Sequence, residues 1–176
     1  MVTTQQGLTI AAANFDDLPE IADVHVKSWQ EAYKGLVPQS YLDALEVSTR
    51  LEKWQVWFRQ GQGDGLILAR IADRVVGFIS FGQGLDQDRP DSAEIYALYL
   101  LKENCSQSLG HQLYQAALGK LKADGFSQVY LWVLDTNRNA IEAYLRWGGG
   151  VEPGRMKTDV IGDQVVQEIS IHMCIV

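Results

Sequence analysis

The feature that most constrains the fold is a pair of strand–turn–helix units between residues 93 and 148. The first covers residues 93–118 (AEIYALYLLKENCSQSLGHQLYQAAL) and the second covers residues 129–148 (VYLWVLDTNRNAIEAYLRWG). In each unit an apolar and aromatic run predicts a buried strand, and the polar loop after it opens directly into an amphipathic helix. Helix N-termini that follow neighbouring strands direct their free N–H groups into one crevice beyond the strand ends, which favours an anionic ligand. The sequence therefore predicts the functional site in this stretch.

The rest of the chain also alternates between helical and strand patterns. Asn14 is a suitable N-cap for the first helix, a break is expected near Val47 in the second, and Asp73-Arg74 is the expected hairpin turn. This alternation predicts a mixed α/β sheet with helices on both faces. The expected elements are a strand at 8–12, helices at 15–33 and 40–58, a hairpin at 65–71 and 75–81, a strand at 94–101, a helix at 108–123, a strand at 127–134, a helix at 137–147, a glycine turn and a strand at 165–174.

Composition limits the class of protein. With 176 residues, of which 47% are hydrophobic, the chain predicts a single domain over residues 1–176 with a substantial core. The net charge of −7 argues against nucleic acid or an anionic membrane as a partner. The sequence has no apolar run of about 18 residues and no signal-peptide pattern, so we expect a cytoplasmic protein. Cys105 and Cys174 lack metal-site spacing, so no metal is expected.

Three segments carry a resemblance to a known family. These are AEIYALYL (residues 93–100), NRNAIEAYLRWG (residues 137–148) and SWQEAYKGLVPQSYLDAL (residues 28–45). With the order of elements, they make nearly the whole chain resemble the GNAT superfamily of acetyl-CoA-dependent N-acetyltransferases. The resemblance implies a mixed, mostly antiparallel sheet that is splayed at its centre. It also implies transfer of an acetyl group from acetyl-CoA, the cosubstrate, to a primary amine of a small molecule or peptide, in a protein that could form a homodimer.

The segment that resembles the family's pyrophosphate loop departs from the family pattern. That pattern is Arg or Gln, two residues, Gly, one residue, then Gly or Ala. Alignment on Leu113 keeps only the final glycine, whereas a shift by two residues recovers two motif residues but misplaces Leu113. Because the loop presents backbone N–H groups to phosphates, serine can replace glycine unless its position requires a positive φ. The cofactor-binding segment implied by the first alignment is Cys105, Ser106, Gln107, Ser108, Leu109 and Gly110.

The resemblance also assigns residues to the acetyl and phosphate groups. Leu98 and Leu100 hold the place where the family's central strand polarises the thioester carbonyl with a backbone N–H. His111 and Lys102 are further candidates for phosphate contacts in an otherwise acidic protein. Leu98 and Leu100 also fit the simpler interpretation of core residues in a buried strand.

Two residues are implied to be catalytic. Glu94 resembles the general base of some family members, acting directly or through water, although a solvent-facing Glu at a strand edge is the alternative. Tyr144 matches the tyrosine that gives a proton or hydrogen bond to the departing thiolate. It shares a helical face with Asn137, seven residues earlier, which we expect to cap the helix and to bind the pantetheine amide. The alternative for Tyr144 is a core tyrosine with a satisfied hydroxyl.

The acceptor side and two alternative functions complete the sequence predictions. Aromatic residues in the first two helices, with Glu31 and Asp43 nearby, suit a cationic amine. Because the segment that resembles the pyrophosphate loop keeps only one residue of the family pattern, an alternative function is that of a non-catalytic GNAT-fold protein that binds CoA or another ligand. A nucleophilic or redox role for Cys105 is a third reading. The aromatic residues are Trp29, Tyr33, Tyr41, Trp54 and Trp57.

Overall fold

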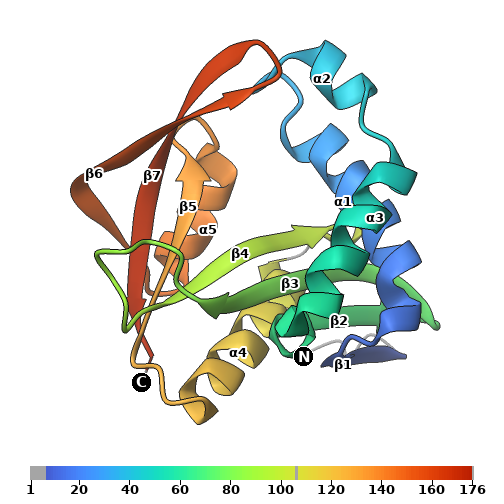
Figure 1. Cartoon of the computed structure of the whole chain (residues 1–176), viewed down its shortest axis with the longest axis horizontal. Coiled ribbons are helices and arrows are strands. Elements are labelled where there is room, and N and C mark those ends of the chain that lie inside the picture. The colour runs from blue at the N-terminus through green and yellow to red at the C-terminus, as the bar shows by residue number, and fades with distance from the viewer. Residues whose placement is uncertain (1–6, 106, 176) are drawn as a thin grey trace.

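The computed structural model describes residues 7–105 and 107–175. Its frame is a seven-stranded sheet in the order β1-β2-β3-β4-β5-β7-β6 (Figure 1). Every neighbouring pair is antiparallel except β4 and β5, which are parallel. The strands are β1 (Leu8–Ala12), β2 (Leu66–Ile71), β3 (Arg74–Gln83), β4 (Ala93–Leu100), β5 (Gln128–Leu134), β6 (Gly150–Ile161) and β7 (Gln164–Cys174).

The sheet is splayed where β4 and β5 meet. These strands pair at only three positions, from Ala93 opposite Val129 to Ile95 opposite Leu131. Beyond Ile95 they diverge, so that β1–β4 and β5–β7 form two halves with an opening between them (Figure 1). The predicted mixed, mostly antiparallel sheet with a splayed centre is therefore confirmed.

A bulge in β4 lies at the start of the splay. Phe81 of β3 pairs with Ile95, but the preceding Ser80 pairs with Ala97, so Tyr96 is an extra residue on β4. Such a bulge bends its strand and redirects the residues beyond it. The bulge and the loss of β5 as a partner therefore coincide at Tyr96.

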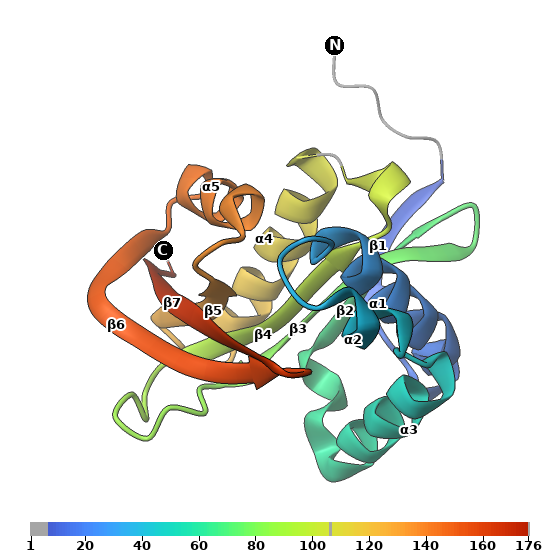
Figure 2. The ribbon, with the colours of Figure 1, turned by 90° about the horizontal axis from the view of Figure 1, so that it is seen from above.

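Helices cover both faces of the sheet, as predicted. The helices α1 (Leu18–Ala32), α2 (Gln39–Asp43) and α3 (Val47–Trp57) lie on one side, and α4 (Gln107–Ala123) and α5 (Arg138–Arg146) lie on the other (Figure 2). Apolar side chains from α4 and from both halves of the sheet share one core, whereas α1 and α3 pack on β2 and β3 in a second. Single-turn helices occur at Phe15–Asp17, Phe58–Gln62, Gly63–Gly65 and Lys102–Asn104.

Local signals in the sequence agree with two helix boundaries. Asn14 accepts a hydrogen bond from the N–H of Asp16 at 2.9 Å and donates its own N–H to Asp17 at 2.8 Å. This capping box opens the turn that leads into α1. The expected break near Val47 is also confirmed, because α2 ends at Asp43 and α3 begins at Val47.

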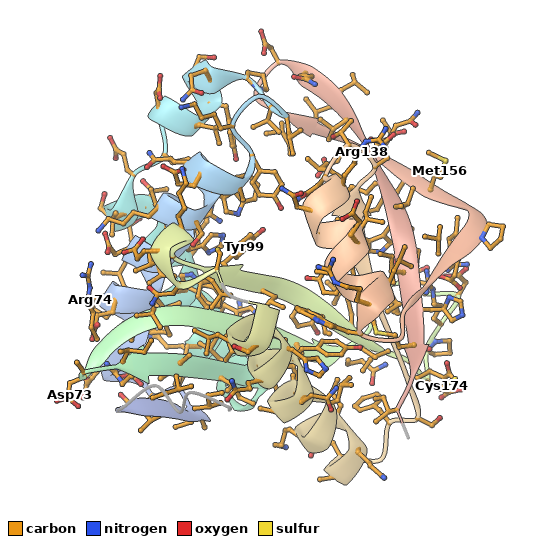
Figure 3. All side chains as sticks on the ribbon, turned by 180° about the vertical axis from the view of Figure 1, so that it is seen from behind. Asp73, Arg74, Tyr99, Arg138, Met156 and Cys174 are labelled. Carbon is orange, nitrogen blue, oxygen red and sulfur yellow. The ribbon has the colours of Figure 1, made fainter. Side chains whose placement is uncertain are left out.

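The predicted hairpin turn was wrong by one residue. The turn consists of Ala72 and Asp73, whose φ angles are 49° and 64°, and Arg74 already belongs to β3. Two consecutive positive φ angles are typical of the turn that matches the twist of a two-residue hairpin. Asp73 and Arg74 mark this end of the hairpin in Figure 3.

Strand β6 was not predicted from the sequence, which indicated only a glycine turn before the last strand. β6 lies at the edge of the sheet, and its pairing with β7 is interrupted between Val151 and Met156. Its side chains are mostly exposed, so the alternation that identifies a half-buried strand is weak. Pro153 is compatible with an edge strand, because one backbone edge there needs no partner.

Candidate active site

A cavity of about 460 Å³ fills the opening between β4 and β5. The last turns of α1, the N-terminal turn of α4 and the inner face of α5 close it. Six of the residues that the sequence assigned to the site line this cleft, namely Leu98, Leu100, Cys105, Gly110, Asn137 and Tyr144.

The edge of β4 offers backbone donors to the cleft. Leu101 donates its N–H to the carbonyl oxygen of Val76 in β3 at 2.9 Å. Since backbone groups in a strand alternate between its two edges, the N–H groups of Leu98 and Leu100 point away from β3, toward the splay. The carbonyl oxygen of Leu100 accepts a hydrogen bond from the Ser28 hydroxyl at 2.9 Å. The cleft therefore contains strand-edge N–H groups that no neighbouring strand engages.

The N-terminal turn of α4 forms the end of the cleft beside Leu100. Because α4 begins at Gln107, Ser108, Leu109 and Gly110 are helical. Leu109 is buried in the core, so only its backbone can serve a ligand, whereas Gly110 lines the cleft. Ser106 and the side chain of Gln107 lie outside the described residues.

The serine that replaces the family glycine causes no backbone strain. In residues 7–105 and 107–175, the only non-glycine residues with a positive φ are Ala72 and Asp73. Ser108 therefore does not require the left-handed conformation that glycine favours. The departure from the family pattern at this position leaves the helix start intact.

Trp147, which follows α5, packs beside the N-terminal turn of α4. Its ring lies 5.3 Å from that of Tyr114 and 5.5 Å from that of Tyr144. A Cβ on Gly110 would lie 3.2 Å from the Trp147 ring, so the glycine leaves room for the indole.

The positive charges near the α4 N-terminus differ from those expected. Lys102 lines the cleft, but its ammonium forms an ion pair with Glu31 at 2.6 Å, which raises the pKa of Lys102 and lowers that of Glu31. His111 lies 5.5 Å from the Trp147 ring and does not line the cleft. Arg146, which was not predicted, lines the cleft from the last turn of α5.

Asn137 and Tyr144 project from α5 into the cleft. Asn137 caps the helix, since its side-chain oxygen accepts the N–H of Ala140 at 3.3 Å. Burial raises the pKa of Tyr144, so its phenol is neutral at physiological pH and available as a donor. Within the described part of the chain, the Tyr144 hydroxyl has no hydrogen-bond partner. A group in the cleft can therefore accept this hydrogen bond without displacing a protein partner.

Two further phenols lie near Tyr144 and were not predicted as a pair. The hydroxyls of Tyr33 in α1 and Tyr99 in β4 are 3.1 Å apart, and both side chains line the cleft. Burial raises the pKa of each, so neither can act as a base near neutral pH. Figure 3 shows Tyr99 near the middle of the molecule, away from the hairpin end at Asp73 and Arg74.

Glu94 lies outside the cleft. Its side chain is 7% exposed, and one carboxylate oxygen accepts the Tyr130 hydroxyl at 2.8 Å and the Leu85 N–H at 3.0 Å. These bonds hold the loop after β3 against β5. The carboxylate is not the strand-edge, solvent-facing group of the alternative interpretation, and it does not line the cavity either.

The chemistry of Cys105 does not favour a nucleophilic role. Burial and the neighbouring Glu103 raise the pKa of its thiol, and the thiol donates to the carbonyl oxygen of Leu101 at 3.4 Å. Since the thiolate is the nucleophilic form, a raised pKa makes this cysteine less reactive. Among the described residues, no three potential metal ligands cluster, and no helix combines the length and apolarity needed to span a membrane.

A second cavity, of about 500 Å³, lies against α1 and α3. It shares Tyr96 and Ala97, the residues at the β4 bulge, with the cleft. The two cavities thus share a wall where β4 leaves β5. This arrangement suits a reaction between two ligands that approach the bulge from different sides.

The mixed sheet splayed between β4 and β5 matches the arrangement that the resemblance to the GNAT superfamily implied. The acetyltransferase (GNAT) family model matches residues 23–149, and the chain belongs to this family. It is 31% identical to the uncharacterized N-acetyltransferase YuaI of Bacillus subtilis over 134 residues, which cover 76% of each chain. It is 26% identical to a probable N-acetyltransferase of Mycobacterium tuberculosis over 136 residues, 76% of this chain and 74% of the relative.

Solved structures show the same fold. The PaiA N-acetyltransferase of Thermoplasma acidophilum, in complex with coenzyme A, superposes with a TM-score of 0.76 at 20% identity. That match covers 96% of this chain and 99% of the other. The putative acetyltransferase yncA of Salmonella typhimurium, with its cofactor acetyl-CoA, gives a TM-score of 0.74 at 15% identity and covers 97% and 95%.

Proposed function

We propose that this protein is an acetyl-CoA-dependent N-acetyltransferase that acts on a primary amine in a ternary complex. The observation that carries the proposal is the open edge of β4, where the N–H groups of Leu98 and Leu100 face a cleft that also contains the Tyr144 hydroxyl. An extended amide chain can add to such an edge as a further strand. The coenzyme A and acetyl-CoA complexes of the two structural neighbours support this assignment.

Each part of the cosubstrate has a matching surface. The pantetheine amides suit the strand-edge N–H groups of β4 and the side chain of Asn137. The phosphates suit the start of α4 at Gln107, where the helix dipole favours negative charge. The exposed Arg146 lines the same cleft and adds positive charge, whereas the charge of Lys102 is paired with Glu31.

The reaction then proceeds by direct attack. The amine lone pair attacks the thioester carbonyl carbon, a C–N bond forms, and the C–S bond breaks as the sulfur leaves with the electron pair. A backbone N–H on the open edge of β4, at Leu98 or Leu100, stabilises the oxyanion that develops on the carbonyl. The Tyr144 phenol donates a hydrogen bond to the departing thiolate.

The proton on the amine leaves through water in this proposal. Among the described residues that line the two cavities, Glu31 is the only carboxylate, and Lys102 already pairs with it. Glu94 lies beneath the loop after β3 and has two protein donors. Its predicted catalytic role stays a prediction, and the geometry favours action through water or through the loop that it holds.

Release of the CoA thiol tests the proposal. Purified protein with acetyl-CoA and a broad panel of primary amines should release thiol, and mass spectrometry should find the acetylated amine. A non-catalytic ligand-binding protein predicts instead that acetyl-CoA raises the melting temperature while no amine yields thiol above the background of hydrolysis. That second pattern across the panel would refute the proposed activity.

A further inference from the structure

We propose that the acceptor is a small amine that also carries an anionic group, a carboxylate, phosphate or phosphonate, held by Arg50 and Lys53 in the second cavity. This inference rests on the proposed function, because it takes the second cavity as the acceptor site. It differs from the sequence prediction of a cationic amine beside carboxylates.

The cavity-facing side of α3 carries two cations. Arg50, Lys53, Trp54 and Trp57 are spaced i, i+3, i+4 and i+7, so they share one helical face, and all four line the cavity. A face that packs on a cavity is normally apolar, and Trp54 and Trp57 meet that expectation. Both cations therefore border the cavity, Arg50 as a half-buried residue and Lys53 as an exposed one.

These cations are free to bind a ligand. Across residues 7–105 and 107–175, neither Arg50 nor Lys53 has an ion-pair partner, whereas Arg70, Arg89 and Arg155 all do. Arg50 is half-buried as a residue, and its guanidinium lies 5.8 Å from the centre of the Trp29 ring. Partial burial strengthens its attraction for an anion relative to an exposed side chain.

Two buried polar residues also line the second cavity. Ser80 of β3 is 2% exposed, lines the cavity, and its hydroxyl has no hydrogen-bond partner among the described residues. His25 of α1 is 7% exposed and also lines the cavity. A hydroxyl that lines a cavity without a protein partner can donate a hydrogen bond to a ligand or to water there.

His25 acts as a donor here. Burial and the nearby Arg50 charge lower the pKa of His25 to about 3, so the imidazole is neutral at physiological pH. Its Nδ1 accepts the indole N–H of Trp54 at 3.2 Å. In the neutral ring the proton therefore lies on Nε2, which makes this nitrogen a donor and not a base. The cavity is thus lined by donors and cations.

Acidic groups near the cavity do not reverse this balance. None of the described lining residues is Asp or Glu. Asp43, which the sequence placed beside the aromatic residues, is exposed on α2 and accepts a hydrogen bond from Gln39 at 2.8 Å. Glu94 approaches from behind the lining residue Leu85, but both of its described hydrogen bonds are to protein donors. The local charge is positive in a protein whose net charge is −7.

The layout of the cavity fixes the order of groups in the acceptor. The amine must lie at Tyr96 and Ala97, the two residues that line both the cavity and the cleft. The anionic group lies at Arg50 and Lys53, and an apolar or aromatic middle part contacts Trp54 and Trp57. A volume of about 500 Å³ lies within the usual range for small-molecule sites.

Matched pairs of amines test the anionic requirement through turnover. Suitable pairs are phenylalanine with phenethylamine, 4-aminobutyrate with butylamine, and 2-aminoethylphosphonate with ethylamine, with spermidine as a polycation. Because charge-assisted hydrogen bonds are strong, kcat/KM should favour an anionic member by about 10- to 100-fold. Preference for spermidine or for the neutral members would overturn the inference while leaving the acetyltransferase proposal intact.

Charge variants localise the effect. Arg50→Gln should raise KM for the anionic amine by about 10- to 100-fold with a smaller change in kcat, and it should leave neutral amines unchanged. Arg50→Lys should recover part of the loss, and Lys53→Gln should have a smaller effect because Lys53 is exposed. Lys122→Gln, in the last turn of α4, is the matched control and should change neither KM. Equal losses for both members of a pair would contradict the inference.

A binding measurement separates this inference from the proposed activity. Trp54 and Trp57 line the cavity, so binding of an anionic amine to the CoA-saturated protein should change the tryptophan fluorescence. The response should saturate, and Arg50→Gln should weaken it by about 10- to 100-fold. If no amine releases thiol but this titration succeeds, the acetyltransferase proposal fails and the anion site stands. If the neutral partner titrates equally well, the anion site fails.

Discussion

Removal of the Tyr144 hydroxyl should slow the chemical step without destabilising the protein. Tyr144→Phe keeps the ring contacts with Trp147 and Tyr114 but removes the donor that faces the cleft. Because this hydroxyl has no partner among the described residues, its loss leaves no protein group unsatisfied. We therefore expect the melting temperature to change little, since surrounding packing is retained.

The expected size of the rate loss follows from the environment of the phenol. A full general acid contributes about 10²- to 10⁴-fold. Burial, however, raises the pKa of Tyr144 above the usual value for tyrosine, whereas a thiol has a pKa of about 8.5. Complete proton transfer from this phenol to the thiolate is therefore uphill, and Tyr144 should act by donating a hydrogen bond. A hydrogen bond to a charged group contributes about 1.5–3 kcal/mol, which predicts a loss of about 10- to 100-fold.

Single-turnover acetylation and thermal unfolding measure the two quantities. Tyr114→Phe is the control, because Tyr114 is fully buried, does not line the cleft and directs its hydroxyl at the Met173 sulfur. This control should keep its rate and lose about 1 kcal/mol of stability, a fall in melting temperature of about 2–4 °C. An unchanged single-turnover rate in Tyr144→Phe would refute the role of Tyr144.

Three further predictions address the cosubstrate, the base and the loop. Acetyl-CoA at a hundredfold excess over its Kd should stabilise the fold by about 2.7 kcal/mol, and the absence of any shift in thermal melts would contradict cofactor binding. In Glu94→Gln, kcat/KM should still rise with pH as the substrate amine loses its proton. If the variant instead lacks a rise at acidic pH that the unaltered protein shows, Glu94 is the base. Ser108→Gly should lower the melting temperature slightly, because glycine in a helix costs about 1 kcal/mol and the Ser108 backbone has no positive φ whose strain glycine would remove. Tighter binding of acetyl-CoA to this variant in a titration would contradict this reasoning.

The sequence predicted the fold and the cleft because their signals are local. The spacing of Asn137 and Tyr144 places both on one face of α5, and both line the cleft. The order of strands and helices around them, with the family resemblance, was sufficient for the sheet and its splay.

The features that were missed depend on partners distant in sequence. The bulge at Tyr96 is a property of the register between β3 and β4, which no pattern within β4 reveals. The setting of Glu94 depends on Tyr130, 36 residues away. For α3, the sequence does place Arg50 and Lys53 on the face of Trp54 and Trp57. Only the structure shows that this face borders a cavity, and this is the observation behind the proposed anionic acceptor.

The short pairing of β4 with β5 has a consequence for motion. Among the described residues, three residue pairs of β4 and β5 join the two halves of the sheet. Apolar side chains of α4 pack against both halves and form much of the other contact between them. The amides of Leu98 and Leu100 should therefore exchange with solvent deuterium rapidly in the free protein, while those bonded within β3–β4 are protected. A ligand that occupies the β4 edge would act as a missing eighth strand, slowing exchange along that edge and coupling the unfolding of the two halves.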